Sequence, residues 1–218
     1  MNTLVRNLSV RAEFCLVLLV GFGPFVAMQL WNAAQRKPLH MTNAGLVVFP
    51  IIELILFAAI LWVGKVRGWS IATFGSRVSW RGAVGGIILF GVAQAAMFGV
   101  SRGMQIVHPE LSPFTFARLA VLPILLISLI NPVFEEVLGT GYLIQLLQRL
   151  GMWPAVMASA IFRGAYHLQF GINAALGVFT LGVIFGFTYW RWRQLWPLIV
   201  AHVLADLLAL FYGSYHAA

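Results

Sequence analysis

Seven long apolar segments follow one another in this chain, and they constrain its fold more than any other feature. They cover residues 13–31, 44–63, 82–101, 119–147, 153–169, 171–190 and 195–213. An α-helix needs roughly 20 such residues to cross a bilayer. The apolar residues run continuously instead of alternating, so strands and a barrel are not expected. The chain is 61% hydrophobic and only 9% charged, whereas soluble domains are about 25% charged. We therefore expect an all-α, polytopic transmembrane helical bundle of about seven to eight spans.

Two details of these segments predict local structure. Pro123 and Pro132 interrupt the fourth segment, so a kink or a split is expected there. Glycines allow helices to approach closely in lipid, and they occur in the third and sixth segments at Gly82, Gly85, Gly86, Gly91, Gly182 and Gly186. The first segment follows two arginines, as in a signal peptide, but it is long and six more follow it. We interpret it as the first span.

The basic residues between the segments predict an orientation. If the N-terminus is cytoplasmic, nine Lys and Arg residues lie on that side and four on the other, which follows the positive-inside rule. The nine are Arg6, Arg11, Lys65, Arg67, Arg77, Arg81, Arg149, Arg191 and Arg193, and the four are Arg36, Lys37, Arg102 and Arg118. A net charge of +8 scattered in this way indicates membrane topology and not a nucleic-acid partner.

Ionisable residues inside the later segments are few, and they lie on three of the segments. They are Glu135, Glu136, Arg163, His167, His202 and Asp206. Arg163 and His167 are four residues apart, as are His202 and Asp206, so each pair shares one helix face. Charges within a membrane are costly and are generally retained for function. We expect these side chains to face one common cavity.

This set of residues is suited to water activation. A carboxylate near an imidazole can hold a water molecule and remove its proton as it attacks a carbonyl, and a second His can stabilise the resulting oxyanion. A Zn²⁺ site made by Glu135, His167 and His202 is the alternative. However, the sequence has no HExxH motif, no GxSxG motif and a single cysteine, Cys15. We expect no cofactor.

Three motifs resemble the CPBP family of CAAX-processing and bacteriocin-processing intramembrane proteases, also called Abi proteins. They are Glu135-Glu136 followed by Gly141-Tyr142-Leu143, then Tyr166-His167, then Leu195-Trp196-Pro197 leading to His202 and Asp206. The resemblance implies a catalytic helical core at 119–213, preceded by variable transmembrane helices at 1–118, in one continuous membrane domain. It also implies a glutamate-dependent protease, although the family was earlier regarded as metal-dependent.

The resemblance assigns a role to each motif residue. Glu135 would activate water with His167, while His202 and Asp206 would form the oxyanion site, and Glu136 would be a structural partner. Two positions depart from the family pattern. Thr140 stands where the EExxxR motif has Arg, so we expect Arg163 to supply the positive charge to Glu136 from the neighbouring helix. Asp206 stands where Asn is usual, and because an ionised Asp cannot donate a hydrogen bond, we expect it to orient His202.

The leading hypothesis is an intramembrane endopeptidase in the bacterial inner (plasma) membrane, with a membrane-associated protein or peptide as substrate and the lipid bilayer around it. No residue identifies a prenyl-binding site. A non-catalytic scaffold or immunity-type membrane protein is one alternative. A proton-coupled carrier is another, slightly favoured by Glu53 in the second segment. The absence of an evident repeat between the two halves argues against a carrier. Gln94 could be the partner of Glu53.

Overall fold

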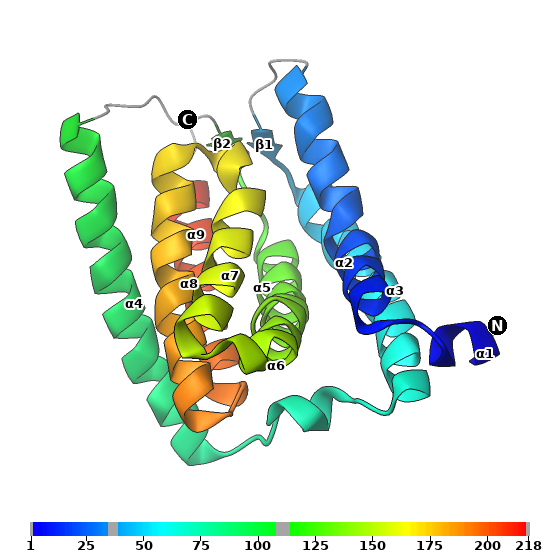
Figure 1. Cartoon of the computed structure of the whole chain (residues 1–218). Helices are drawn as coiled ribbons and strands as arrows, with labels where there is room; N and C mark the ends of the chain where they lie inside the picture. The colour runs from blue at the N-terminus through cyan, green and yellow to red at the C-terminus, as the bar shows by residue number, and fades with distance from the viewer. Residues whose placement is uncertain (1, 35–38, 108–113, 217–218) are drawn as a thin grey trace.

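Every predicted apolar segment forms a helix in the computed structural model, which describes residues 2–34, 39–107 and 114–216 (Figure 1). The fold is an all-α bundle, as expected. Its helices are α1 (Asn2–Arg6), α2 (Val10–Ala34), α3 (Asn43–Arg67), α4 (Trp80–Val107), α5 (Val121–Glu135), α6 (Leu143–Leu147), α7 (Met152–Tyr166), α8 (Ile172–Trp192) and α9 (Trp196–Tyr215). Short 3-10 turns lie at η1 (Ile71–Phe74), η3 (Gln148–Leu150) and η4 (Leu168–Phe170), and η2 (Glu136–Tyr142) is a π-helix.

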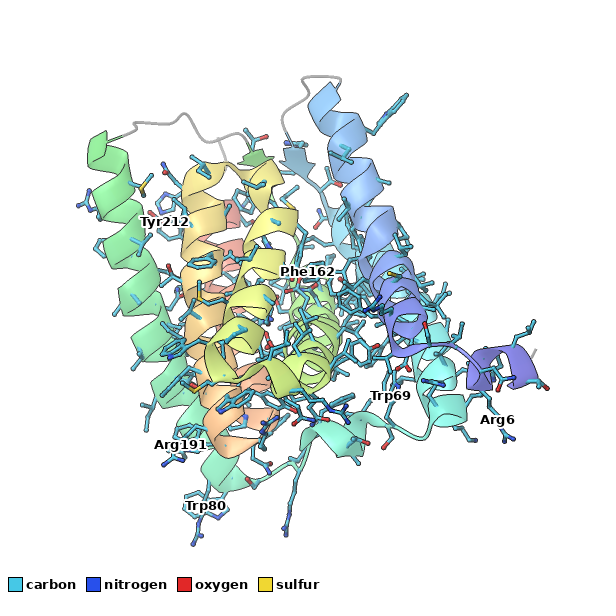
Figure 2. All side chains as sticks on the ribbon, viewed as in Figure 1. Arg6, Trp69, Trp80, Phe162, Arg191 and Tyr212 are labelled. Atoms are coloured by element: carbon cyan, nitrogen blue, oxygen red, sulfur yellow. The ribbon has the colours of Figure 1, made fainter. Side chains whose placement is uncertain are left out.

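Six helical stretches among the described residues are long and apolar enough to cross a membrane, and the protein is an integral membrane protein. The expected count of about seven to eight spans is therefore only approximate, because α7, with 15 residues, is shorter than a full span. Figure 2 shows Arg6, Trp69, Trp80 and Arg191 near one end of the bundle and Tyr212 towards the other. Two of the nine arginines and lysines expected on one side thus lie at the same end.

The fourth segment does not break at its prolines. Pro123 is the third residue of α5, where the missing N–H has no partner to lose, and Pro132 lies within α5. The helix continues past Pro132, and the departure from α-helical geometry begins at Glu136. There the backbone N–H donates to the carbonyls of both Pro132 and Val133, and the chain then winds as the π-helix η2. Short π-helical turns often mark functional sites.

Two short strands form where none was expected. β1 (Leu39–Met41) and β2 (Phe114–Phe116) pair in parallel, with His40 opposite Thr115, and the two side chains share a 2.8 Å hydrogen bond. The prediction failed here because these strands lie in connecting segments, outside the apolar runs on which it was based. The pair lies at one end of the bundle (Figure 1).

The same end ties the starts of α3 and α5 together. Asn43, the first residue of α3, accepts a hydrogen bond from the Ala120 backbone N–H at 2.7 Å. Its side-chain nitrogen donates to the Arg118 carbonyl at 3.3 Å. Thr42 caps α3 by accepting from the Gly45 backbone N–H at 3.1 Å. One side chain therefore holds the first turns of two neighbouring helices level with each other.

At the opposite end, the buried Glu13 side chain joins α2 to α3 and η2. It accepts hydrogen bonds from Arg67 at 2.7 Å, Trp69 at 3.0 Å and the Tyr142 hydroxyl at 3.3 Å. These bonds satisfy a carboxylate that is only 6% exposed, as a buried charge requires. The contact fixes α2 and α3 against the last residue of the π-helix.

Some of the predicted glycine contacts are close. A Cβ at Gly182 would lie 2.9 Å from the Ala160 Cα, where α8 packs on α7. A Cβ at Gly86 would lie 2.7 Å from the Pro197 carbonyl, where α4 packs on α9. Gly82 and Gly186 also approach neighbouring helices, whereas Gly85 and Gly91 have open space beside them. The glycine pattern thus marked helix contacts at four of its six positions.

Gly182→Leu should destabilise the bundle, because backbone atoms of α7 occupy the space that the new side chain needs. Overpacking of this kind costs about 1–3 kcal/mol or more. Gly85→Leu is the matched control, since nothing lies within 4 Å of its Cβ position. Thermal unfolding in detergent should show a lower midpoint for Gly182→Leu and an unchanged one for Gly85→Leu. Equal midpoints in the two variants would contradict the assigned α7–α8 packing.

Candidate active site

The two adjacent glutamates have different environments where α5 passes into η2. Glu136 is fully buried, with 0% of its surface exposed, and Glu135 is 7% exposed and lines a cavity. Glu136 is thus held inside the protein, whereas Glu135 is available to a molecule bound in the cavity. This difference is what a pair made of a structural and a reactive carboxylate requires.

Three side chains from three elements bind Glu136. Arg163 on α7 approaches its Oε1 atom at 2.7 Å, and His202 on α9 contacts the same oxygen through Nδ1 at 2.8 Å. Thr140, one turn along η2, donates its hydroxyl to Oε2 at 2.8 Å. The ion pair expected between Arg163 and Glu136 is present, and both side chains are at most 1% exposed. Thr140 therefore supplies a hydrogen bond at the position where the motif has Arg, and Arg163 supplies the charge.

His202 lies close to three acidic side chains, those of Glu135, Glu136 and Asp206. Its Nε2 atom is 3.5 Å from Asp206 Oδ1 and 4.0 Å from Glu135 Oε2. The expectation that Asp206 orients His202 is thus only partly met, because the shortest contact of His202 is with Glu136. The buried Glu136 carboxylate, 2.8 Å from Nδ1, therefore holds the ring more closely than Asp206, which lies one turn along the same helix and is 23% exposed.

His167 caps the end of α7, and its ring is held by the main chain. Its Nδ1 atom lies 2.9 Å from the Arg163 carbonyl oxygen. Because a carbonyl oxygen only accepts hydrogen bonds, Nδ1 must carry the hydrogen. In the neutral ring Nε2 then has a free lone pair and can act as a base. Arg163 thus takes part in both contacts, with its side chain on Glu136 and its backbone on His167.

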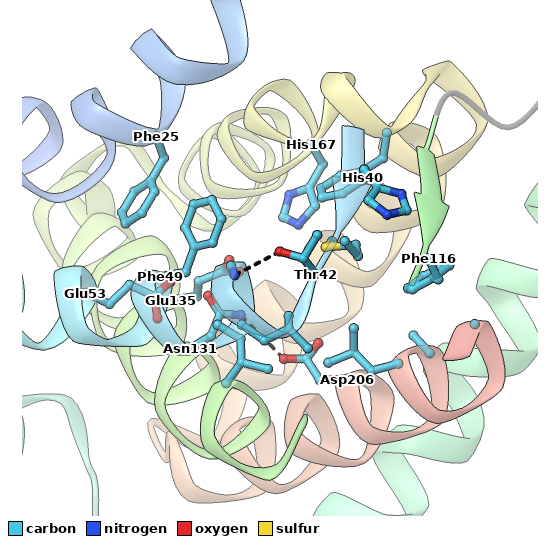
Figure 3. A pocket seen from close by; sticks show the side chains of 18 of the residues that line it. Phe25, His40, Thr42, Phe49, Glu53, Phe116, Asn131, Glu135, His167 and Asp206 are labelled. Carbon is cyan, nitrogen blue, oxygen red and sulfur yellow. Dashed lines mark hydrogen bonds between the residues drawn. The ribbon is translucent and has the colours of Figure 1, made fainter. Parts of the chain in front are cut away.

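A cavity of about 840 Å³ joins these residues. Among the predicted site residues, Glu135, His167 and Asp206 line it, whereas Glu136, Thr140, Arg163 and His202 are buried and are not among its lining residues. Figure 3 shows His167 facing the group formed by Glu135, Asn131 and Asp206. Much of the remaining lining is aromatic and comes from both halves of the chain: Phe22, Phe25, Phe49, Phe116, Phe134, Tyr166 and Phe170.

Two cavity residues, Asn131 and Glu53, were not assigned to the site from the sequence. Asn131 lies on α5, one turn before Glu135. Its amide satisfies its neighbours best when the nitrogen donates to Glu53 Oε1 at 2.7 Å and to Glu135 Oε1 at 3.2 Å. In the opposite orientation the nitrogen faces Asp206 Oδ2 at 3.4 Å. The partner of Glu53 is therefore Asn131 and not Gln94. The i to i+4 spacing of Asn131 and Glu135 was the available signal.

The residues considered for a zinc site do not surround a common point. Among the described residues, no group of three or more His, Cys, Asp or Glu side chains is placed to hold a metal ion. His202 Nε2 is 4.0 Å from Glu135 Oε2, and its other ring nitrogen is bound to Glu136. Ligands of one zinc ion would each lie about 2 Å from it. The arrangement of Glu135, His167 and His202 does not fit that geometry.

Removal of Arg163 should destabilise the protein, because Glu136 would then be buried without its cation. Breaking a buried ion pair in this way costs about 3–5 kcal/mol. We expect Arg163→Met to lower the thermal unfolding midpoint strongly, and Arg163→Met combined with Glu136→Gln to recover part of the loss. Arg149→Met, which removes an exposed arginine in η3, is the control and should unfold as wild type does. Wild-type stability in Arg163→Met would contradict the role given to the pair.

Comparison with known proteins agrees with these motifs. Residues 116–208 match the family model described as type II CAAX prenyl endopeptidase Rce1-like. No curated protein and no solved structure matches the chain. The matched residues include every predicted site residue, and they exclude α2 and α3, which complete the cavity. Over residues 116–208 the chain is similar to the Rce1-like type II CAAX prenyl endopeptidases, and the resemblance drawn from the three motifs is confirmed.

Proposed function

We propose that the protein is an intramembrane endopeptidase in which Glu135 and His167 activate a water molecule. The observation that carries the proposal is the placement of both residues in the wall of one cavity. The buried Oε2 atom of Glu135 and the Nε2 atom of His167 have no hydrogen-bond partner among the described residues. These are the two acceptors that a water nucleophile needs. The match to a family of CAAX endopeptidases supports the same reaction class.

The chemistry follows from the contacts of these groups. Glu135 takes a proton from water while the water oxygen forms a bond to the carbonyl carbon of the substrate, and His167 Nε2 orients that water. The carbonyl oxygen then becomes negatively charged. As the C–N bond breaks, Glu135 returns the proton to the leaving amine nitrogen. One water is consumed, and one acid and one amine are formed.

The oxyanion would be stabilised by His202. When its ring is doubly protonated, Nδ1–H donates to Glu136 and Nε2–H points to the side where Glu135 and Asp206 lie. A donor held by a buried carboxylate needs little rearrangement when charge develops nearby. Tyr166 lines the cavity, and its buried hydroxyl has no hydrogen-bond partner among the described residues, so it is a second candidate donor for that oxygen.

The substrate in this proposal is a membrane-associated protein or peptide. The cavity walls are mostly aromatic and aliphatic, which suits apolar side chains next to the bond that is cut. We further propose that the N-terminus faces the cytoplasm of a bacterial cell, with the protein in the inner membrane. Nine of the basic residues between the spans support that orientation.

Glu135→Gln should abolish proteolysis without unfolding the protein, because Gln retains the shape of the side chain but is not a base. General-base catalysis is worth about 10²–10⁴ in rate. The measurement is a comparison of new protein N-termini in cells that carry wild type or Glu135→Gln at matched levels. Peptides that depend on wild type would identify the substrate. Arg149→Met is the control, since Arg149 is exposed and lies outside the cavity, and its profile should match wild type.

Identical profiles for wild type and folded Glu135→Gln would contradict the protease proposal. They would favour a non-catalytic membrane scaffold. Altered proton-linked uptake in Glu135→Gln would instead favour the carrier alternative.

We also propose that the reaction depends on glutamate and not on zinc, because the candidate ligands do not surround one point. Cleavage of a substrate found in the N-terminus comparison should proceed at an unchanged rate after treatment of the purified protein with 1,10-phenanthroline. The non-chelating 1,7 isomer is the control. A loss of rate that added Zn²⁺ restores would contradict this assignment.

A further inference from the structure

Glu53 is a buried carboxylate that the reaction described above does not use. It lies on α3 and is only 6% exposed. It also lines the cavity that contains Glu135. A carboxylate in such a place is costly unless it has a partner. Its position in the wall of the site calls for a physical explanation.

The contacts of Glu53 lead to the catalytic glutamate through one amide. Glu53 Oε1 accepts from the Asn131 nitrogen at 2.7 Å, and Glu135 Oε1 accepts from the same nitrogen at 3.2 Å. An amide nitrogen has two hydrogens, so it can serve both carboxylates. Figure 3 shows Glu53, Asn131 and Glu135 next to one another. The three side chains form a chain of hydrogen bonds from α3 to the end of α5.

The two oxygens of Glu135 differ in their hydrogen bonding. Oε1 is held by Asn131, whereas Oε2 has no hydrogen-bond partner among the described residues. A general base must present one oxygen to water in a fixed direction. Asn131 can fix Oε1 only if its amide does not rotate. Rotation would turn its nitrogen towards Asp206, whose Oδ2 lies 3.4 Å away. The 2.7 Å bond to Glu53 favours the orientation that also reaches Glu135.

We propose that Glu53 is a positioning residue that acts through Asn131 and holds the catalytic glutamate in the direction needed for water activation. The inference rests on the proposed protease function. It places one determinant of the rate outside residues 116–208, on a helix that the family match does not cover. Glu53 does not contact the substrate in this scheme, and its effect is on the rate of the chemical step.

The test compares Glu53→Leu with Glu53→Gln in the purified full-length protein, with a substrate found by the N-terminus comparison. Leu removes the acceptor, so kcat should fall about 10- to 100-fold with KM nearly unchanged, as expected when the geometry of a general base is lost. Gln still has a carbonyl oxygen that can accept from Asn131, so Glu53→Gln should retain most of the activity. Ile60→Ala is the control, because it opens a hole two turns further along α3 without touching Asn131.

Different outcomes separate the proposals. Wild-type kcat in folded Glu53→Leu overturns the role of Glu53, as does an equal loss in Glu53→Gln and Glu53→Leu, which would show that charge and not hydrogen bonding matters. An equal fall of kcat in Ile60→Ala would show that the effect is general destabilisation and would also overturn it. If wild type gives no cleavage that depends on Glu135, the protease proposal itself fails.

A second measurement tests the contact without activity. Glu53→Leu and Asn131→Leu are made singly and together, and thermal unfolding is followed in detergent. Because the two side chains share one interaction, the midpoint of the double variant should fall by clearly less than the two single shifts added. Additive shifts would show that Glu53 and Asn131 are independent and would overturn the positioning role.

Discussion

The ion pair between Glu136 and Arg163 is the interaction on which the arrangement of the site depends. Both side chains are at most 1% exposed and lie on different helices. Placing either alone in a low-dielectric interior would cost several kcal/mol, so each is retained only with the other in contact. Thr140 and His202 also form hydrogen bonds with Glu136. A single buried charge thereby fixes the relative positions of η2, α7 and α9, which carry the groups around the cavity.

The backbone of Arg163 extends this effect to His167. Its carbonyl accepts from His167 Nδ1, so the residue that neutralises Glu136 also selects the ring nitrogen presented to the cavity. Glu135 lies beside Glu136 in the chain, and it is directed elsewhere because successive helical side chains point about 100° apart. His167, a proposed catalytic residue, is therefore oriented by a neighbour that does not line the cavity.

Much of the bundle and of the motif residues could be predicted from the sequence. Continuous apolar runs form helices whatever their neighbours. Because Thr140 stands where the motif has Arg, the contact between Arg163 and Glu136 could be predicted as well.

Other features depend on which helices are adjacent, and the periodicity of the sequence carries no such information. Gln94 was offered as the partner of Glu53, but α4 packs on α8 and α9 while α3 packs on α5. Likewise, β1 and β2 belong to connections far apart in the chain, so their pairing left no local signal. The π-helix at Glu136–Tyr142 also left no periodic pattern from which it could be predicted.

The hydrogen bonds of Asn43 to the segment before α5 have a consequence for depth in the membrane. Since α3 and α5 begin level with each other, residues equally far along the two helices lie in one layer. Glu53 is the eleventh residue of α3 and Asn131 the eleventh of α5. At 1.5 Å per residue both lie about 15 Å from the shared end. The hydrocarbon core of a bilayer is about 30 Å thick, so this layer falls near its middle. Glu135 lies four residues beyond Asn131, about 21 Å from the same end, so under the proposed function a peptide bond entering from that end would have to pass this layer to reach it.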